Sequence, residues 1–133
     1  MESTSNAPLY IVAGDEMQKI MRRMFPERES VPFREDLSKG PVKGNQITGE
    51  FISERAAFWG VSPEEYERNL DGIINLDLAR EVVLCFGEDD CCKANCAFML
   101  AYLKQKGYKK PIRVKVVNEI TLEILREYTV LEE

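Results

Sequence analysis

Short apolar runs alternate along the chain with longer segments in which apolar residues recur every three or four positions. The runs at 9–13, 81–87 and 112–117 are rich in β-branched and aromatic residues, which is typical of strands. The run at 81–87 is apolar enough to be covered on both faces of a sheet. A shorter run at 31–33 contains a proline, which restricts it to an edge. The pattern predicts an α/β fold: a small, mostly parallel sheet of four to five strands with helices on both faces, as in a Rossmann-like three-layer sandwich.

The first helix is expected to follow Gly14 and to end before Pro26. Asp15 is the predicted N-cap, and Gln18 lies three residues later, where its side chain would complete a capping box. The residues from 37 to 49 are rich in glycine and show little periodicity, so they predict a long loop.

Two amphipathic segments then predict a helical insertion between the second and third strands. The first spans about 51–59, and the second begins at Ser62 as N-cap and reaches about residue 74. A further helix is expected from about 89 to 106, followed by the strand at 112–117. The tail from 119 to 133 fits a helix poorly and is interpreted as an edge strand.

The length of 133 residues suits one hydrophobic core. We expect a disordered leader at 1–8 and a single α/β domain at 9–133. The net charge of −5 opposes binding to nucleic acid or to an anionic membrane. No apolar run approaches the ~20 residues that span a bilayer, and the start is polar without a signal-type segment, so a cytoplasmic protein is expected.

Four cysteines lie within one short stretch, which does not resemble the disulfide framework of a secreted domain. A thiolate metal site is geometrically conceivable, but we favour packing roles, since buried free cysteine is common. The chain has no histidine, which excludes Ser-His and Cys-His nucleophile pairs. Catalysis would have to use carboxylates, lysine, tyrosine, thiols or a metal. The four cysteines are Cys85, Cys91, Cys92 and Cys96.

Polar and mostly acidic residues follow each predicted strand, and ligands of parallel sheets bind at those strand ends. If Asp15, Asp36 and either Glu88 or Asp89 converge, their oxygens would suit Mg²⁺ or Mn²⁺ and position a phosphate. We favour the alternative that these residues cap helices and complement helix dipoles.

Two further features have both a functional and a structural interpretation. Gly14 would allow an anion to approach the amides of the first helix, but the chain has no dinucleotide or P-loop motif, so a tight turn is favoured. Arg55 and Trp59 would suit stacking on a base, although such groups more often anchor a helix to a sheet, the interpretation that we favour.

Four motifs together resemble the bacterial family of domains of unknown function 1835 (DUF1835). They are LYIVAGD near the start, REDLSKGPV at 34–42, RAAFWGVSPEEY at 55–66 and EVVLCFGEDDCCKANCAFMLAYL at 81–103. The likeness covers most of residues 9–117. The resemblance implies a shared pocket without an established activity, and it carries over to Asp15, Arg34, Glu35, Asp36, Gly40, Pro41, Arg55, Phe58, Trp59, Asp89 and Asn95.

The chain also departs from the family as we know it. Cys85 stands where relatives commonly have an aromatic residue and Cys91 where they commonly have an apolar one, which supports packing roles. Many relatives continue into a further C-terminal region, so self-association or a protein partner is an expectation. Asn95 would suit a hydrogen bond to the R-E-D loop, as an alternative to ligand contact.

The leading hypothesis is a domain that binds a small anionic ligand, such as a nucleotide or phosphate, in a polar pocket at the strand ends. One alternative is a metal-dependent enzyme of phosphoryl transfer or nucleic-acid hydrolysis, and another is a protein-interaction or regulatory module. The sequence names no catalytic residue, cofactor or resident metal. The expected ligand-binding residues are Asp15, Arg34, Glu35, Asp36, Arg55, Trp59, Asp89 and Asn95.

Overall fold

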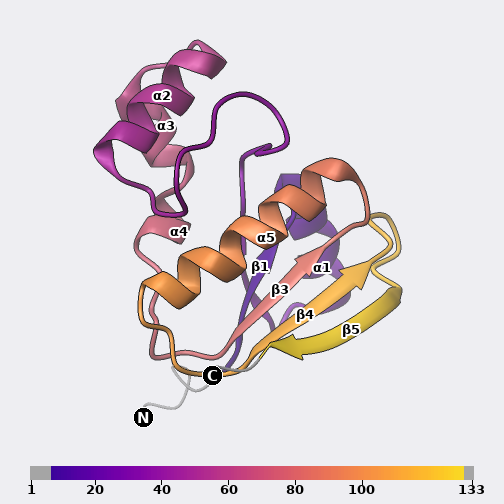
Figure 1. Cartoon of the computed structure of the whole chain (residues 1–133). Coiled ribbons are helices and arrows are strands. Elements are labelled where there is room, and N and C mark those ends of the chain that lie inside the picture. The colour runs from indigo at the N-terminus through magenta and orange to yellow at the C-terminus, as the bar shows by residue number, and fades with distance from the viewer. Residues whose placement is uncertain (1–6, 131–133) are drawn as a thin grey trace.

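Five strands form one sheet, in the spatial order β2-β1-β3-β4-β5 (Figure 1). The computed structural model describes residues 7–130. The first four strands in this order are parallel, and β5 runs antiparallel to β4. The predicted α/β class with a mostly parallel sheet is therefore confirmed. The strands are Leu9–Val12 (β1), Glu29–Pro32 (β2), Val82–Phe86 (β3), Ile112–Val117 (β4) and Ile124–Val130 (β5).

Helices fill the connections between the parallel strands. The helix α1 joins β1 to β2, α5 joins β3 to β4, and α2, α3 and α4 form the predicted insertion between β2 and β3. Thr48, Ser62 and Asp89 cap α2, α3 and α5 through their side-chain oxygens, so the predicted cap at Ser62 is confirmed. The helices are Asp15–Met24 (α1), Gly49–Trp59 (α2), Pro63–Asn69 (α3), Asp71–Ile74 (α4) and Asp90–Gln105 (α5).

The second inserted helix breaks in two at Leu70, where the sequence predicted one continuous helix. The break lets α4 lie against the edge strand β2. A Cβ on Gly72 would come within 2.6 Å of the Val31 side chain, so this glycine permits the close approach.

Residues of β3 alternate between two hydrophobic clusters, and every residue of the strand is buried. Leu84 and Phe86 belong to the cluster on the side of α5, whereas Val83 and Cys85 belong to the cluster on the side of α1. Figure 1 shows α5 in front of the sheet and α1 behind it. The prediction of a central strand covered on both faces is confirmed.

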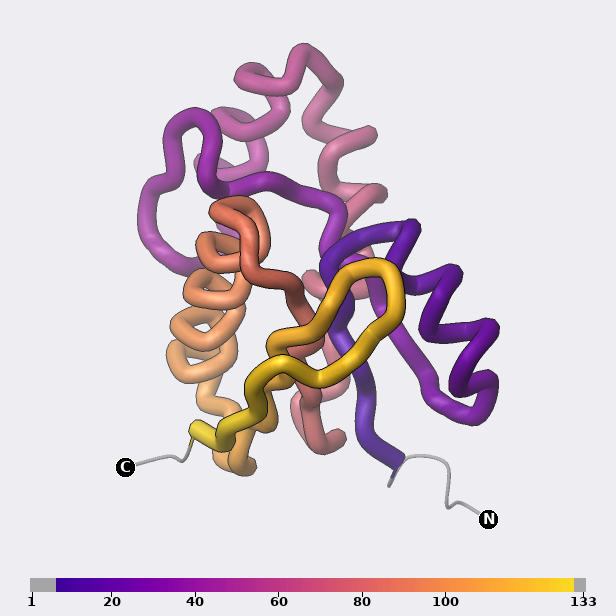
Figure 2. The backbone as a smooth tube through the Cα atoms, turned by 90° about the vertical axis from the view of Figure 1, so that its right-hand side faces the viewer, coloured from indigo at the N-terminus to yellow at the C-terminus, as the bar shows by residue number. Residues whose placement is uncertain are grey.

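The predicted edge strand in the tail is also confirmed, and its residues are mostly exposed. Figure 2 shows the hairpin of β4 and β5 nearest the viewer, with α5 on one side of the sheet and α1 on the other. Among the described helices, α5 lies along this hairpin, with residues of both lining the same cavities.

The predicted capping box at the start of α1 is wrong. Gly14 occupies the N-cap position and no side chain caps the helix. The Asp15 carboxylate instead accepts a hydrogen bond of 2.8 Å from Arg34, a residue that sequence spacing cannot bring near. The Gln18 amide donates to the Ser30 carbonyl of β2. Gly14 has an extended φ of 165°, so this turn does not require glycine, contrary to the prediction.

Most of the predicted leader, residues 1–6 of 1–8, lies outside the described residues. The carbonyls of Ala7 and Pro8 accept hydrogen bonds from the Arg80 guanidinium at 2.9 and 3.4 Å. Across residues 7–130, none of the helices has the length and apolar character required to cross a membrane.

Candidate functional site

The loop after β2 is fastened to α2 by a buried ion pair between Glu35 and Arg55. The side chains of both residues are 1% exposed, and the guanidinium meets the carboxylate at 2.7 and 2.8 Å in a bidentate geometry. The same guanidinium donates to the backbone carbonyls of Asp36, Lys39 and Pro41 at 2.6 to 3.0 Å. Arg55 therefore uses its donors entirely within the protein.

The Glu35 carboxylate accepts two further hydrogen bonds, from the Tyr66 hydroxyl and from the Trp59 indole at 2.9 Å. Burial alone would raise the pKa of Glu35, but the hydrogen bonds from Arg55 and Tyr66 outweigh it and hold the pKa below its ordinary value. Burial and the adjacent carboxylate raise the pKa of Tyr66. Glu35 is ionised and Tyr66 is protonated at neutral pH.

Asn95 joins this group from α5. Its side-chain amide donates to the Glu35 carbonyl at 2.7 Å and accepts from the Leu37 amide at 3.0 Å, as the structural alternative predicted. We call the residues Glu35, Arg55, Trp59, Tyr66 and Asn95 the Glu35 cluster. Four of them were expected to bind a ligand, but their polar atoms bond to one another and to the loop, which the sequence could not distinguish from ligand contact.

The remaining predicted residues lie at the strand ends and are more exposed. Asp15 and Arg34 pair on the surface, and Asp36 accepts hydrogen bonds from the Ser38 amide and hydroxyl. Bonds from Ser38 lower the pKa of Asp36. Asp89 caps α5 by accepting from the Cys92 amide at 2.8 Å. For Asp89 the favoured interpretation as a helix cap is confirmed.

The alternative of a metal site required Asp15, Asp36 and either Glu88 or Asp89 to converge, but the structure brings a different set together. Within residues 7–130, the donor atoms of Asp89, Cys92 and Glu119 lie within 4.8 Å of one another, and neither Asp15 nor Asp36 belongs to this set. Burial and the neighbouring Asp89 raise the pKa of Glu119. Burial raises the pKa of Cys92 to about 12, so this sulfur is a protonated thiol at neutral pH.

The other thiols have the properties of packing residues. All four are free, and burial raises the pKa of Cys85 and Cys91 to about 11. Raised pKa values leave little thiolate for nucleophilic or redox chemistry. Cys96 is half-buried on α5, where it faces a cavity.

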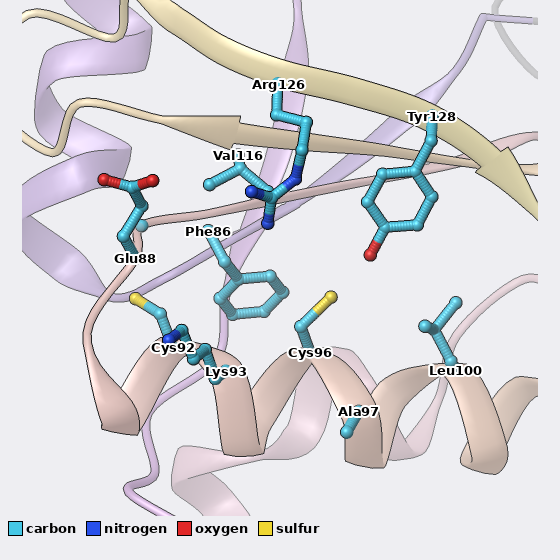
Figure 3. A pocket seen from close by; sticks show the side chains of 11 residues that line it. Phe86, Glu88, Cys92, Lys93, Cys96, Ala97, Leu100, Val116, Arg126 and Tyr128 are labelled. Carbon is cyan, nitrogen blue, oxygen red and sulfur yellow. The ribbon is translucent and has the colours of Figure 1, made fainter.

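A cavity of about 520 Å³ lies between α5 and the β4–β5 hairpin, beginning at the C-terminal end of β3 (Figure 3). Arg126 projects from β5 toward α5, and the Tyr128 hydroxyl points the same way above the helix. Tyr128 and Cys96 interact across the cavity. Its lining residues are Phe86, Gly87, Glu88, Cys92, Lys93, Cys96, Ala97, Leu100, Val116, Arg126 and Tyr128.

The two cations of this cavity have unused bonding capacity. Among the described residues, neither Arg126 nor Lys93 forms a side-chain hydrogen bond or an ion pair. Glu88 is the single acid among the described residues of the lining. The sequence did not predict Arg126, Lys93 and Tyr128 as site residues. The available signal was the alternation of side chains along β5, which puts Arg126 and Tyr128 on the same face of the strand.

Comparisons of the chain with protein-family models, with curated proteins and with solved structures found no match.

Proposed function

We propose that this chain is a small-ligand-binding domain and that its ligand carries a negatively charged group, such as a phosphate or carboxylate. The observation that carries the proposal is the Arg126 guanidinium, which forms no hydrogen bond or ion pair with residues 7–130 and is directed into a cavity of about 520 Å³. A guanidinium presents donors in a fork that matches the oxygens of both groups.

The place and size of the cavity support this function. It begins at the C-terminal end of β3, where ligands of parallel sheets bind. Its volume falls within the range of roughly 300–1,000 Å³ that is usual for small-molecule sites.

The charges of the lining support an anion rather than a cation. Arg126 and Lys93 outnumber Glu88, whereas the whole chain has a net charge of −5. Since Glu88 lies at one end of the cavity, the negative group of the ligand belongs near Arg126 and the Tyr128 hydroxyl (Figure 3). Phe86, Leu100 and Val116 offer an apolar surface for the rest of the ligand.

A thermal-shift screen with nucleotides, sugar phosphates and small carboxylates tests this function. A ligand at a hundred times its Kd should stabilise the protein by about 2.7 kcal/mol. Arg126→Gln should abolish most of that stabilisation, while Arg22→Gln on the exposed side of α1 should keep it. If no anion stabilises the wild-type protein, or if Arg126→Gln responds like wild type, the proposal is wrong.

A second candidate function is protein interaction through the free edge of β5. Ile124, Leu125 and Tyr128 are 40–48% exposed on this strand, and an open edge can pair with a strand of another chain. Size-exclusion chromatography with light scattering tests it. Self-association that Leu125→Lys abolishes would support an interaction module, and a monomer at every concentration would argue against a homo-oligomer.

We also propose that the chain is related to the DUF1835 family. What supports this is that its R-E-D-L and R-x-x-F-W motifs meet in the Glu35 cluster, through the bonds of Glu35 to Arg55 and Trp59. An alignment in which the Glu35 and Arg55 positions varied independently would contradict the shared role.

A further inference from the structure

The cavity that contains Arg126 continues into a second one along the same helix. The second cavity has a volume of about 340 Å³ and shares Ala97 and Leu100 with the first. We call the two together the α5–β5 groove. The residues that line its second half are Ala97, Leu100, Ala101, Lys104, Tyr108, Lys110, Ile112 and Val130.

The two halves of the groove differ in chemistry. The first half contains Glu88, Arg126, Tyr128 and the thiols, whereas the second is walled by aliphatic side chains and the Tyr108 ring. The Tyr108 hydroxyl is already used, because it accepts from the Val82 amide at 2.8 Å and donates to the Arg80 carbonyl at 3.1 Å. What the second half offers a ligand is therefore mainly apolar surface.

The charged residues of the second half are both lysines. Among residues 7–130, Lys104 and Lys110 line it, and no acidic residue does. Lysine stems extend an apolar wall while their ammonium groups stay in water. The groove thus combines a polar, cationic end, a long apolar wall and a cationic rim, in a chain of net charge −5.

We propose that the ligand of this groove is a single-chain amphiphile, with an anionic head beside Arg126 and an unbranched apolar chain between α5 and the β4–β5 hairpin. This inference rests on the proposed function and names its ligand class. From Cys96 to Lys104 the helix rises by about 12 Å, which gives the alkyl chain of the ligand an extended path along α5. A short polar anion would leave this apolar wall unused.

Isothermal titration with acetate, butyrate, octanoate and decanoate, each below its micelle concentration, tests the proposal. Each methylene that enters the second half should tighten binding about fourfold. Octyl glucoside has a chain of the octanoate type with a neutral head, so it should bind at least tenfold more weakly than octanoate.

Variants assign the two ends of the ligand. Ala101→Trp fills the second half and should flatten the dependence on chain length while short anions bind as before; Val130→Trp does the same from β5 if the first variant folds poorly. Arg126→Gln should weaken every carboxylate by a similar factor and leave octyl glucoside unchanged. Ala57→Trp, on the exposed surface of α2, is the matched control and should bind like wild type.

The outcomes separate this inference from the proposed function. Anions that bind through Arg126 without any dependence on chain length would overturn the amphiphile and leave the binding function standing. Absence of binding by every anion would overturn both. If both tryptophan variants kept the dependence on alkyl-chain length, the alkyl chain would bind elsewhere and the proposed groove site would be wrong. Binding to anionic vesicles without binding to a monomeric amphiphile would also overturn the proposal.

Discussion

Arg55 and Arg126 represent two regions of the molecule in which the same side chain has opposite surroundings. In the Glu35 cluster the Arg55 guanidinium is buried, binds one carboxylate through two atoms and reaches three backbone carbonyls. In the α5–β5 groove Arg126 is exposed and has no hydrogen-bond partner in the part of the chain that the structure describes. Both arginines occur beside aromatic residues, yet only one has capacity left for a ligand.

A polar side chain therefore indicates a binding site when its donors or acceptors are left unbonded, rather than when it belongs to a motif. Removing one partner of a buried pair strands the other charge in a poorly hydrated place, which is costly. Removing an exposed, unpaired cation strands nothing. Substitutions in each region should therefore differ in their effect on stability.

The largest effect is expected for Arg55→Met, which fills similar space but leaves the Glu35 carboxylate without its cation. We expect the free energy of unfolding to fall by about 3–5 kcal/mol. Urea unfolding followed by circular dichroism measures it, with Arg22→Met as the exposed control. A loss below about 1 kcal/mol would mean that the cluster is not what holds the loop.

Gly40→Ala should have the next largest effect, because Gly40 has a φ of +79° and a Cβ there would come within 2.8 Å of the Phe58 ring. Both the backbone conformation and this contact oppose a side chain, so we expect a loss of about 1–3 kcal/mol. Gly14→Ala is the matched control, since its backbone is extended and no atom lies within 4 Å of the added Cβ. Equal effects of the two substitutions in urea unfolding would contradict the packing of the loop against α2.

A smaller effect should appear on acidification. The pKa of Glu35 is lower in the folded than in the unfolded chain, so its ionised form stabilises the fold. This stabilisation is complete above its ordinary pKa of 4.5 and is lost as the pH falls through the lowered folded value. Glu35→Gln removes the titrating group, so the difference in unfolding free energy between wild type and variant should shrink below pH 4.5. A difference independent of pH would show that the charge of Glu35 is not what stabilises the loop.

The sequence was sufficient for the framework because its signals are local. The five apolar residues of β3 and the caps Ser62 and Asp89 depend on neighbours within a few positions. The break at Leu70 was not predicted, since the close approach of Gly72 to Val31 is a contact across the fold. The cap at Asp15 failed for the same reason, because Arg34 is 19 residues away.

Prediction of the site depended more heavily on contacts between residues that are distant in the sequence. The motif residues did come together, but a sequence cannot tell whether Glu35 faces Arg55 or a ligand, because that depends on where α2 packs. The groove was missed because its cation comes from the tail. Only the antiparallel register of β5 on β4, which pairs Arg126 with Val116, puts this side chain over α5. The residues that matter most for the proposed ligand therefore lie in the tail, the segment whose hydrophobic pattern is weakest.

The smallest effect on stability is expected for substitutions in the α5–β5 groove. Arg126→Gln and Lys93→Gln should each change the free energy of unfolding by no more than about 0.5 kcal/mol, because neither side chain forms a hydrogen bond or ion pair with residues 7–130. The matched measurement is urea unfolding of Arg55→Gln, which should lose several times more although it carries the same substitution. If Arg126→Gln were as destabilising as Arg55→Gln, Arg126 would belong to the structure like the Glu35 cluster, and the argument for a ligand would fail. A stable Arg126→Gln variant that no longer binds anions would show that Arg126 serves ligand binding and not the stability of the fold.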